Sequence, residues 1–269
     1  MPEEFRGRYG PWALVAGAAV GLGAEWSRQL AARGVDLLLI DRDAAPLAAL
    51  TDAIRRDHGV EVRPVPLDLA RADLVEALRP ALAGRDVGLL VYNAALGTVA
   101  PFLALDAGHL QAMLDVNCRG PLLLAQALLP DMVARGRGGL VLMSSLSGNV
   151  GSAQLAVYAA SKAFALVLAD ALWAELGPRG IDVLAVQPGS TRTPGWLSSQ
   201  PAGDVGMGLP VSDPEQVVRE ALESLGVEPV VVPGEVNRQG AEAMRRLPRR
   251  QAIELLSAVT ARLVQNYPR

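Results

Sequence analysis

Two side chains of this 269-residue sequence, Tyr158 and Lys162, are suited to moving a proton together. A phenol loses its proton near pH 10, so an unaided tyrosine is a poor base at neutral pH. If the segment is helical, residues four apart lie on one face, and the ammonium of Lys162 would lower the pKa of the phenol. The chain has 24 arginines and only this lysine, which indicates a position that needs a compact ammonium rather than a planar guanidinium. The spacing alone is near chance, so the interpretation depends on what surrounds the pair.

Ser145 is the nearest candidate partner, 13 residues before Tyr158. It follows the apolar run Gly139–Met143, at the carboxyl end of a predicted strand, where open α/β sheets bind their ligands. Its hydroxyl can hydrogen-bond a substrate carbonyl and the oxyanion that develops from it. The sequence therefore predicts a carbonyl-binding redox site in which Ser145 and Tyr158 contact the substrate. The neighbouring Ser144 is interpreted as strand-end packing.

A glycine-rich segment, Ala16–Gly23, lies between the first apolar run and the first helix-like stretch. Glycine lets the backbone turn sharply and approach a ligand without a Cβ clash, and the free N–H groups at the start of a helix favour a pyrophosphate. Asp41 closes the second predicted strand, 18 residues after Gly23, where a carboxylate can accept hydrogen bonds from both ribose hydroxyls of a dinucleotide. The residues predicted to hold the pyrophosphate are Gly17, Gly21, Leu22 and Gly23.

The choice between NAD and NADP depends on Asp41 and Arg42. A carboxylate repels a 2′-phosphate and binds the free hydroxyl of NAD, whereas an arginine beside it can bind the phosphate of NADP. No basic residue lies at positions 18–20 to add a second phosphate contact. The sequence favours NAD and keeps NADP as the alternative.

Short apolar runs alternate with longer amphipathic stretches along the chain. The predicted strands are Ala13–Ala16, Leu37–Ile40, Val62–Val65, Val87–Tyr92, Gly139–Met143, Val183–Gln187 and Pro229–Val232. The predicted helices are Ala24–Arg33, Pro46–Asp57, His109–Arg135, Tyr158–Leu176 and Glu215–Leu225. This alternation predicts an α/β fold, with a single Rossmann-like domain over residues 1–269 that contains a doubly wound parallel sheet with helices on both faces.

Two segments do not follow the alternation. Thr191–Val211 is rich in Gly, Pro and Ser and is predicted to be a substrate loop, in which Trp196 is a candidate substrate contact. Residues 237–269 form an arginine-rich tail that is predicted to be helical, with its arginines on a solvated face. Trp173, inside a predicted helix, is expected in the core.

The composition argues against several classes of protein. A net charge of −3 provides no basic field for nucleic acid. No charge-free apolar run reaches the roughly 18 residues of a membrane span, and the polar Met1–Gly10 does not read as a signal peptide. Cys118 has no partner for a disulfide, and His58 and His109 are too far apart to give metal-ligand spacing. We therefore expect a cytoplasmic protein with no metal, no nucleic-acid partner and no membrane span.

The spacing Gly17-x-x-x-Gly21-x-Gly23, with Ser145, Tyr158 and Lys162 downstream, resembles the short-chain dehydrogenase/reductase family. The resemblance continues after the third predicted strand (Asp68-Leu69), at the end of the fourth (Tyr92–Gly97, YNAALG) and after the sixth (Pro188-Gly189). The further cofactor-binding residues that it implies are Asp68, Leu69, Asn93, Ala94, Pro188, Gly189, Thr191 and Thr193, together with Tyr158 and Lys162.

The resemblance also implies that Ser145, Tyr158 and Lys162 form the active site, with Asn117 holding a water in a proton relay. The sequence departs from the family pattern where Ala16 replaces a threonine, and where Tyr92 and Ala95 replace an asparagine and a glycine. These changes leave the fold in place but could loosen the cofactor site.

Together these features predict an NAD(P)-dependent oxidoreductase that interconverts a ketone and a secondary alcohol. Apolar residues in Thr191–Val211 suggest a lipophilic small-molecule substrate. Two alternatives stay open: a non-catalytic dinucleotide-binding sensor or partner protein, and an NADPH-dependent acyl or polyketide ketoreductase. The resemblance further implies a homodimer or homotetramer assembled through the predicted helices His109–Arg135 and Tyr158–Leu176.

Overall fold

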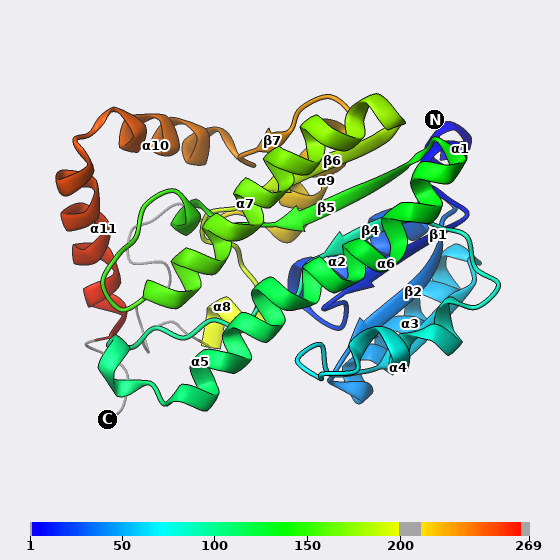
Figure 1. Ribbon diagram of the computed structural model, residues 1–269, viewed down its shortest axis with the longest axis horizontal. Helices are drawn as coiled ribbons and strands as arrows, with labels where there is room; N and C mark the ends of the chain where they lie inside the picture. The colour runs from blue at the N-terminus through cyan, green and yellow to red at the C-terminus, as the bar shows by residue number, and fades with distance from the viewer. Residues whose placement is uncertain (1, 199–210, 265–269) are drawn as a thin grey trace.

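The computed structural model describes residues 2–198 and 211–264 of the chain. Seven parallel strands form one sheet in the order β3-β2-β1-β4-β5-β6-β7. Figure 1 labels β1, β2 and β4 to β7 in this sheet. The strands are β1 (Trp12–Ala16), β2 (Asp36–Asp41), β3 (Val62–Pro66), β4 (Val87–Tyr92), β5 (Gly138–Met143), β6 (Ile181–Val186) and β7 (Val230–Val231). The prediction of a doubly wound parallel sheet is confirmed, and each strand lies within two residues of its predicted ends.

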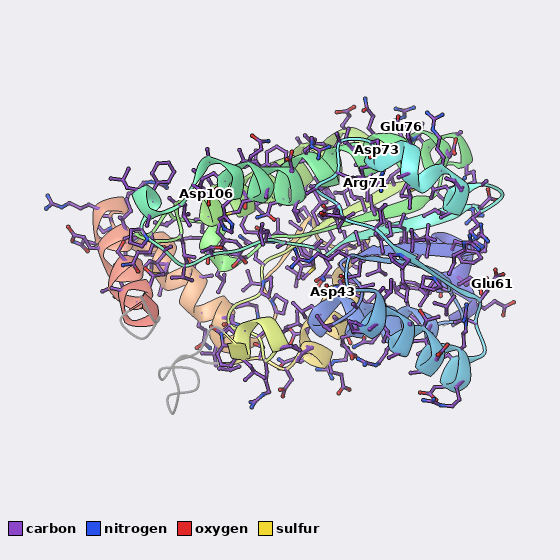
Figure 2. All side chains as sticks on the ribbon, turned by 90° about the horizontal axis from the view of Figure 1, so that it is seen from below. Asp43, Glu61, Arg71, Asp73, Glu76 and Asp106 are labelled. Carbon is purple, nitrogen blue, oxygen red and sulfur yellow. The ribbon has the colours of Figure 1, made fainter. Side chains whose placement is uncertain are left out.

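Helices cover both faces of this sheet. They are α1 (Pro2–Tyr9), α2 (Gly21–Ala31), α3 (Ala44–His58), α4 (Leu74–Leu82), α5 (Ala107–Leu114), α6 (Gly120–Arg135), α7 (Ala156–Leu176), α8 (Pro194–Ser198), α9 (Pro214–Ser224), α10 (Glu235–Arg246) and α11 (Arg249–Val264). Figure 2 shows the strands between the two helical layers, with Asp43 at the start of α3 and Asp106 at the start of α5.

The two faces of the sheet bury two separate apolar clusters because successive strand residues point to opposite sides. Along β1, Ala13 and Val15 join the cluster with α2, α3 and α9, whereas Trp12 and Leu14 join the cluster with α4, α6 and α7. The central strands β1, β4 and β5 are therefore buried along their whole length, as expected for a parallel sheet covered on both faces.

The strand order reverses between β1 and β4, which lie side by side at the centre of the sheet. Open α/β sheets bind ligands at such a switch point, in the crevice beyond the carboxyl ends of the strands. The loops that follow β1, β4, β5 and β6 all leave from this edge, so the fold brings their side chains together.

The predicted helix His109–Arg135 is wrong as a single α-helix. In the structure α5 ends at Leu114, a π-helical turn spans Asp115–Arg119, and α6 begins at Gly120. Pro121 lacks a backbone N–H, so the regular i to i−4 pattern cannot pass through this point unbroken. The sequence prediction also omitted α1, α4 and α8, which are short.

The helix α7, with the turn that follows it to Arg179, is the one helix in the described part of the chain that is long and apolar enough to cross a membrane. Length and composition alone give this result, which the helices of soluble cores also produce. One side of α7 packs on β5 and β6 with Ala165 and Ala169 buried, whereas Val167 and Trp173 are exposed. The prediction that Trp173 lies in the core is wrong, since 45% of the residue is exposed.

Candidate active site

The glycine loop after β1 is packed too tightly for side chains at two of its predicted positions. Gly17 has φ +77°, and a Cβ there would lie 2.6 Å from the Cα of Ala94. A Cβ on Gly23 would overlap the carbonyl oxygen of Gly17. Asn93 donates its side-chain N–H to that same carbonyl at 2.8 Å, which ties the end of β4 to the loop. Gly23 therefore permits close packing of α2 on the loop, while Gly17 shapes the turn itself.

A cleft of about 340 Å³ opens at this switch point. Ten of the residues predicted to bind the cofactor line it: Gly17, Gly21, Leu22, Asp41, Arg42, Asp68, Leu69, Asn93, Ala94 and Thr193. Its floor is the N-terminus of α2, where free N–H groups and the helix dipole favour an anionic group. The lining residues come from the carboxyl ends of β1, β2, β3, β4 and β6 and from the turn that carries Val116, and together they fit an elongated dinucleotide.

The carboxylate of Asp41 is held in place from two sides. The N–H of Ala19 donates to Oδ2 at 2.9 Å, and the N–H of Asp43 donates to Oδ1 at 3.2 Å. Arg42 is mostly exposed, and its guanidinium lies 4.0 Å from the carboxylate of Asp43. The carboxylate of Asp41, which lines the cleft, is thus fixed by backbone N–H groups, whereas the side chain of Arg42 is largely exposed.

Six of the predicted cofactor residues do not line this cleft: Gly23, Tyr158, Lys162, Pro188, Gly189 and Thr191. The carbonyl of Pro188 accepts the N–H of Leu146 at 3.2 Å, so this segment braces the loop that carries Ser145. The hydroxyl of Thr191 donates to the carbonyl of Gly189 at 3.1 Å, and Thr191 is buried. Residues 199–210 of the predicted substrate loop lie outside the described residues.

Eight residues line the cleft that the sequence did not assign to the cofactor: Val20, Asp43, Leu67, Ala95, Leu96, Val116, Pro194 and Gly195. Most of them are neighbours of assigned residues in the same loops, so widening each motif by a residue would have found them. Val116 is different, because it comes from the π-helical turn, and no sequence pattern had indicated that turn.

The predicted catalytic side chains meet at the same edge of the sheet. Ser145 follows β5, and Tyr158 lies in the first turn of α7, partly buried. The ring of Tyr158 packs against Gly97, where a Cβ would lie 3.0 Å from the ring. The loop after β4, which lines the cleft with Ala95 and Leu96, therefore also contacts the phenol of Tyr158.

Lys162 lies one helical turn after Tyr158 in α7, and the residue is 5% exposed. Its ammonium donates to the carbonyl of Met143 at 2.7 Å and lies 5.6 Å from the centre of the Tyr158 ring. The hydroxyl of Ser144 donates to the carbonyl of Lys162 at 2.7 Å, which fixes α7 against the end of β5. Ser144 is thus a packing residue, as the sequence indicated.

Burial disfavours the charged forms of both Tyr158 and Lys162. It raises the pKa of the Tyr158 phenol, and a hydrogen bond with Ser145 partly offsets that increase. It lowers the pKa of Lys162 to about 8. The sequence had suggested that Lys162 would lower the pKa of the phenol, but in this arrangement the opposing influence comes from Ser145. The structure therefore favours a protonated Tyr158, the form that donates a proton to a carbonyl.

The buried ammonium of Lys162 predicts how stability depends on pH. Its pKa is about 8 in the folded protein and about 10.5 when exposed, so keeping it charged costs about 3 kcal/mol at neutral pH. Between these values the unfolded chain binds the proton and the folded one does not, so this cost falls as pH rises. We expect the free energy of unfolding of the wild type to increase relative to Lys162→Met over this range, measured by urea unfolding. A constant or decreasing difference would contradict the lowered pKa.

Asn117 links the loop after β4 to α7. Its amide oxygen accepts the N–H of Leu96 at 2.7 Å, and its amide nitrogen donates to the carbonyl of Leu96 at 2.8 Å and to the hydroxyl of Ser161 at 2.9 Å. Ser161 in turn donates to the carbonyl of Tyr158 at 2.8 Å. The side chain of Asn117 thus positions both the cofactor-lining loop and the helix of Tyr158, which the sequence did not predict.

The C-terminal helix α11 lies on the loop that joins Ser145 to Tyr158. The hydroxyl of Ser257 accepts the N–H of Ala153, and the hydroxyl of Thr260 donates to its carbonyl, each at 2.9 Å. The next residue, Gln154, has φ +68° and is the one non-glycine residue in the described ranges with a positive value. The tail predicted from sequence to be helical therefore braces a backbone-strained loop beside the predicted catalytic residues.

No group of three His, Cys, Asp or Glu side chains that could hold a metal occurs within residues 2–198 and 211–264. Cys118 is partly buried, and burial raises the pKa of its thiol. Trp196 lies in α8, with its backbone N–H donating to the hydroxyl of Thr193 at 3.2 Å. Since Thr193 lines the cleft, Trp196 lies close to the predicted cofactor site.

Most of the chain is similar to known proteins of one kind. A family model described as short chain dehydrogenase matches residues 11–202. The chain is 31% identical over 253 residues to a 7beta-hydroxysteroid dehydrogenase from Clostridium sardiniense, covering 94% of this chain and 97% of that protein. It is 32% identical over 228 residues to a very-long-chain 3-oxoacyl-CoA reductase from Podospora anserina, covering 82% of this chain and 65% of that protein.

Solved structures give the same picture. A structure from work on the stereoselectivity of 7beta-hydroxysteroid dehydrogenase has a TM-score of 0.88 at 30% identity, covering 93% of this chain and 98% of that chain. A short-chain dehydrogenase from Sphingobium yanoikuyae in complex with NADPH has a TM-score of 0.75 at 30% identity, covering 88% and 94%. The likeness thus extends over most of the fold.

Proposed function

This chain belongs to the short-chain dehydrogenase/reductase family and is an NAD(P)-dependent oxidoreductase, and from that premise we propose that it interconverts a lipophilic ketone and its secondary alcohol at the edge of the sheet described above. The observation that carries the proposal is the meeting of Ser145, Tyr158 and Lys162 beside a dinucleotide-sized cleft.

The residues of the cleft fit a nicotinamide dinucleotide. The glycine loop turns tightly into the N-terminus of α2, where a pyrophosphate would bind, and the carboxylate of Asp41 is fixed where a ribose would lie. The bound cofactor supplies or accepts the hydride in this family. Ser145 would hold the substrate oxygen, Tyr158 would donate the proton to it, and Lys162 would stabilise the phenolate that remains. Oxidation of an alcohol is the reverse, with the tyrosinate as base.

A polycyclic or otherwise bulky ketone is the substrate class we favour. The support is the similarity to hydroxysteroid dehydrogenases over nearly the whole chain, together with the apolar Trp196 and Leu197 in α8. An acyl thioester ketone is the second candidate, supported by similarity to the very-long-chain 3-oxoacyl-CoA reductase. A non-catalytic sensor is disfavoured, because it would not require a serine and a buried lysine beside the tyrosine.

Turnover of a ketone panel tests this proposal. Purified protein is given NADH or NADPH with steroid ketones, bulky aryl ketones and 3-oxoacyl thioesters, and oxidation of the cofactor is followed by absorbance. We expect reduction of one or more bulky ketones. Cofactor binding, measured by fluorescence, without turnover of any member would support the sensor instead.

We propose NAD as the preferred cofactor and keep NADP as the alternative. The support is the fixed carboxylate of Asp41, which would face a 2′-phosphate at close range, while Arg42 is exposed. A structural neighbour was solved with NADPH, which supports the alternative. The preference therefore depends on the charge of Asp41.

Replacing Asp41 separates its charge from its hydrogen bonds. Asp41→Ala removes both, and we expect the ratio of kcat/KM for NADH over NADPH to fall by about tenfold or more, as expected for loss of a close like-charge repulsion. Asp41→Asn keeps an acceptor for the N–H of Ala19 and should give most of that shift. Steady-state kinetics with both cofactors measure it, and an unchanged ratio in both variants would show that another residue decides.

We propose that the enzyme is a cytoplasmic homodimer or homotetramer assembled through the outer faces of α5, α6 and α7. The support is a set of exposed apolar side chains on these helices: Leu114, Leu122, Val167 and Trp173. Since the inner side of α7 packs on the sheet and carries Lys162, a second copy of the chain is a suitable cover for its apolar outer side.

A further inference from the structure

Tyr92 replaces an asparagine of the family pattern, and the structure shows what its side chain contacts. Its side chain points to the face of the sheet that carries α4, α6 and α7, and the residue is 3% exposed. Its hydroxyl donates to the backbone carbonyl of Val116 at 2.6 Å. Burial raises the pKa of the phenol far above its usual value, so Tyr92 stays a neutral donor at any pH at which the enzyme works.

The carbonyl of Val116 lies in the π-helical turn Asp115–Arg119. The N–H of Gly120 donates to the carbonyl of Asp115, which is the i to i−5 pattern of a π-helix. The same pattern one residue later would pair the carbonyl of Val116 with the N–H of residue 121, but residue 121 is a proline and has no N–H. The hydroxyl of Tyr92 supplies the missing donor, so the phenol and the turn are complementary.

Gly120 completes this arrangement. A Cβ at position 120 would overlap the hydroxyl of Tyr92, so only glycine lets the helix come this close to the phenol. Tyr92, Gly120 and Pro121 thus act as a set: the proline removes the donor, the tyrosine replaces it, and the glycine makes room.

The turn that Tyr92 holds presents two parts of the active site. Val116 lines the cofactor cleft. Asn117 follows it directly and connects Leu96 with Ser161, which in turn bonds to the carbonyl of Tyr158. We propose that Tyr92 is a positioning residue for catalysis, whose hydroxyl fixes the π-helical turn so that Asn117 holds the cofactor loop and the helix of Tyr158 in register. This inference rests on the proposed function of the same site.

Tyr92→Phe removes one hydroxyl and keeps the packing of the ring. We expect kcat to fall about tenfold or more with little change in KM for the cofactor, and the pH profile of kcat to shift, since the proton donor Tyr158 is displaced. We also expect faster hydrogen exchange in residues 93–100, because the N–H of Leu96 is protected by the side chain of Asn117. Tyr9→Phe is the matched control, since Tyr9 is equally buried and donates to Asp182 at 2.7 Å at the opposite end of the sheet. This control should alter neither kcat nor that exchange.

A double variant tests the hydrogen bond itself. In Tyr92→Phe/Pro121→Ala, the N–H of residue 121 becomes available to the carbonyl of Val116, and we expect part of the lost kcat to return. A double variant as slow as the single one would count against the hydrogen bond as the cause. If Tyr92→Phe has the kcat and the pH profile of the wild type while Tyr158→Phe is inactive, the inference is overturned and the proposed function stands. This holds even if hydrogen exchange in residues 93–100 of Tyr92→Phe has become faster. Full activity of Tyr158→Phe would instead overturn the proposed function.

Discussion

The variant Tyr158→Phe is expected to lose nearly all turnover while still binding the cofactor. The phenylalanine keeps the ring that packs against Gly97 and loses only the hydroxyl. A positioned general acid typically contributes about 10²- to 10⁴-fold to the rate, so kcat should fall by that much with the best ketone of the panel. Steady-state kinetics give kcat, and titration of NADH fluorescence gives the dissociation constant, which should stay within about a factor of three.

The control for this variant is Tyr9→Phe, which removes a buried hydroxyl at the far end of the sheet from the site. It should cost stability without changing kcat. Thermal unfolding of both variants shows that each is folded. Turnover by Tyr158→Phe at the wild-type rate would remove Tyr158 from the mechanism.

The variant Lys162→Arg is expected to be nearly as damaging, although it keeps the positive charge. Lys162 is 5% exposed, and its ammonium donates to the carbonyl of Met143. A guanidinium is larger and planar, and it does not change its charge in the working pH range. We expect kcat to fall by about 10²-fold or more, close to the loss of a general acid–base partner.

The pH profile of kcat distinguishes an ammonium with a lowered pKa from a group that is positively charged at every accessible pH. Burial lowers the pKa of Lys162 to about 8, so its charge can change within the accessible range, whereas that of an arginine cannot. The part of the kcat profile that depends on Lys162 should therefore disappear in Lys162→Arg. Wild-type activity and an unchanged profile in this variant would show that the site needs only a positive charge.

The sheet and the cleft were predictable because their signals are local. Apolar runs such as Val87–Tyr92 mark buried strands wherever they occur, and the glycines at 17 and 23 are required by contacts with backbone atoms nearby in the fold. Asp41 follows from its place at the end of a strand. These features depend on residue type and spacing, which the sequence displays directly.

The π-helical turn and the role of Tyr92 could not be predicted, because they depend on contacts between distant parts of the sequence. Both depend on a hydrogen bond between residues 24 positions apart, Tyr92 and Val116, on different elements. The single helix predicted across this region shows the limit of periodicity, since a one-residue insertion hardly changes an amphipathic pattern. The contact of α11 with Ala153 is similarly distant in the sequence.

The pKa of Tyr158 depends on more than the presence of Lys162 four residues later. Spacing showed that Lys162 could stand beside the phenol, but not how deeply both would be buried or that Ser145 would counter the effect of burial. Such values depend on the whole surroundings of a group, which only the folded chain provides.

A crystal structure of the protein with bound NAD⁺ and a ketone analogue tests the central claim most directly. The account predicts that the hydroxyls of Ser145 and Tyr158 both contact the carbonyl oxygen of the analogue, whose carbon faces C4 of the nicotinamide, with Lys162 near the ribose. A complex in which the phenol of Tyr158 faces bulk water, or lies too far from the nicotinamide for one carbonyl to contact both, would contradict it.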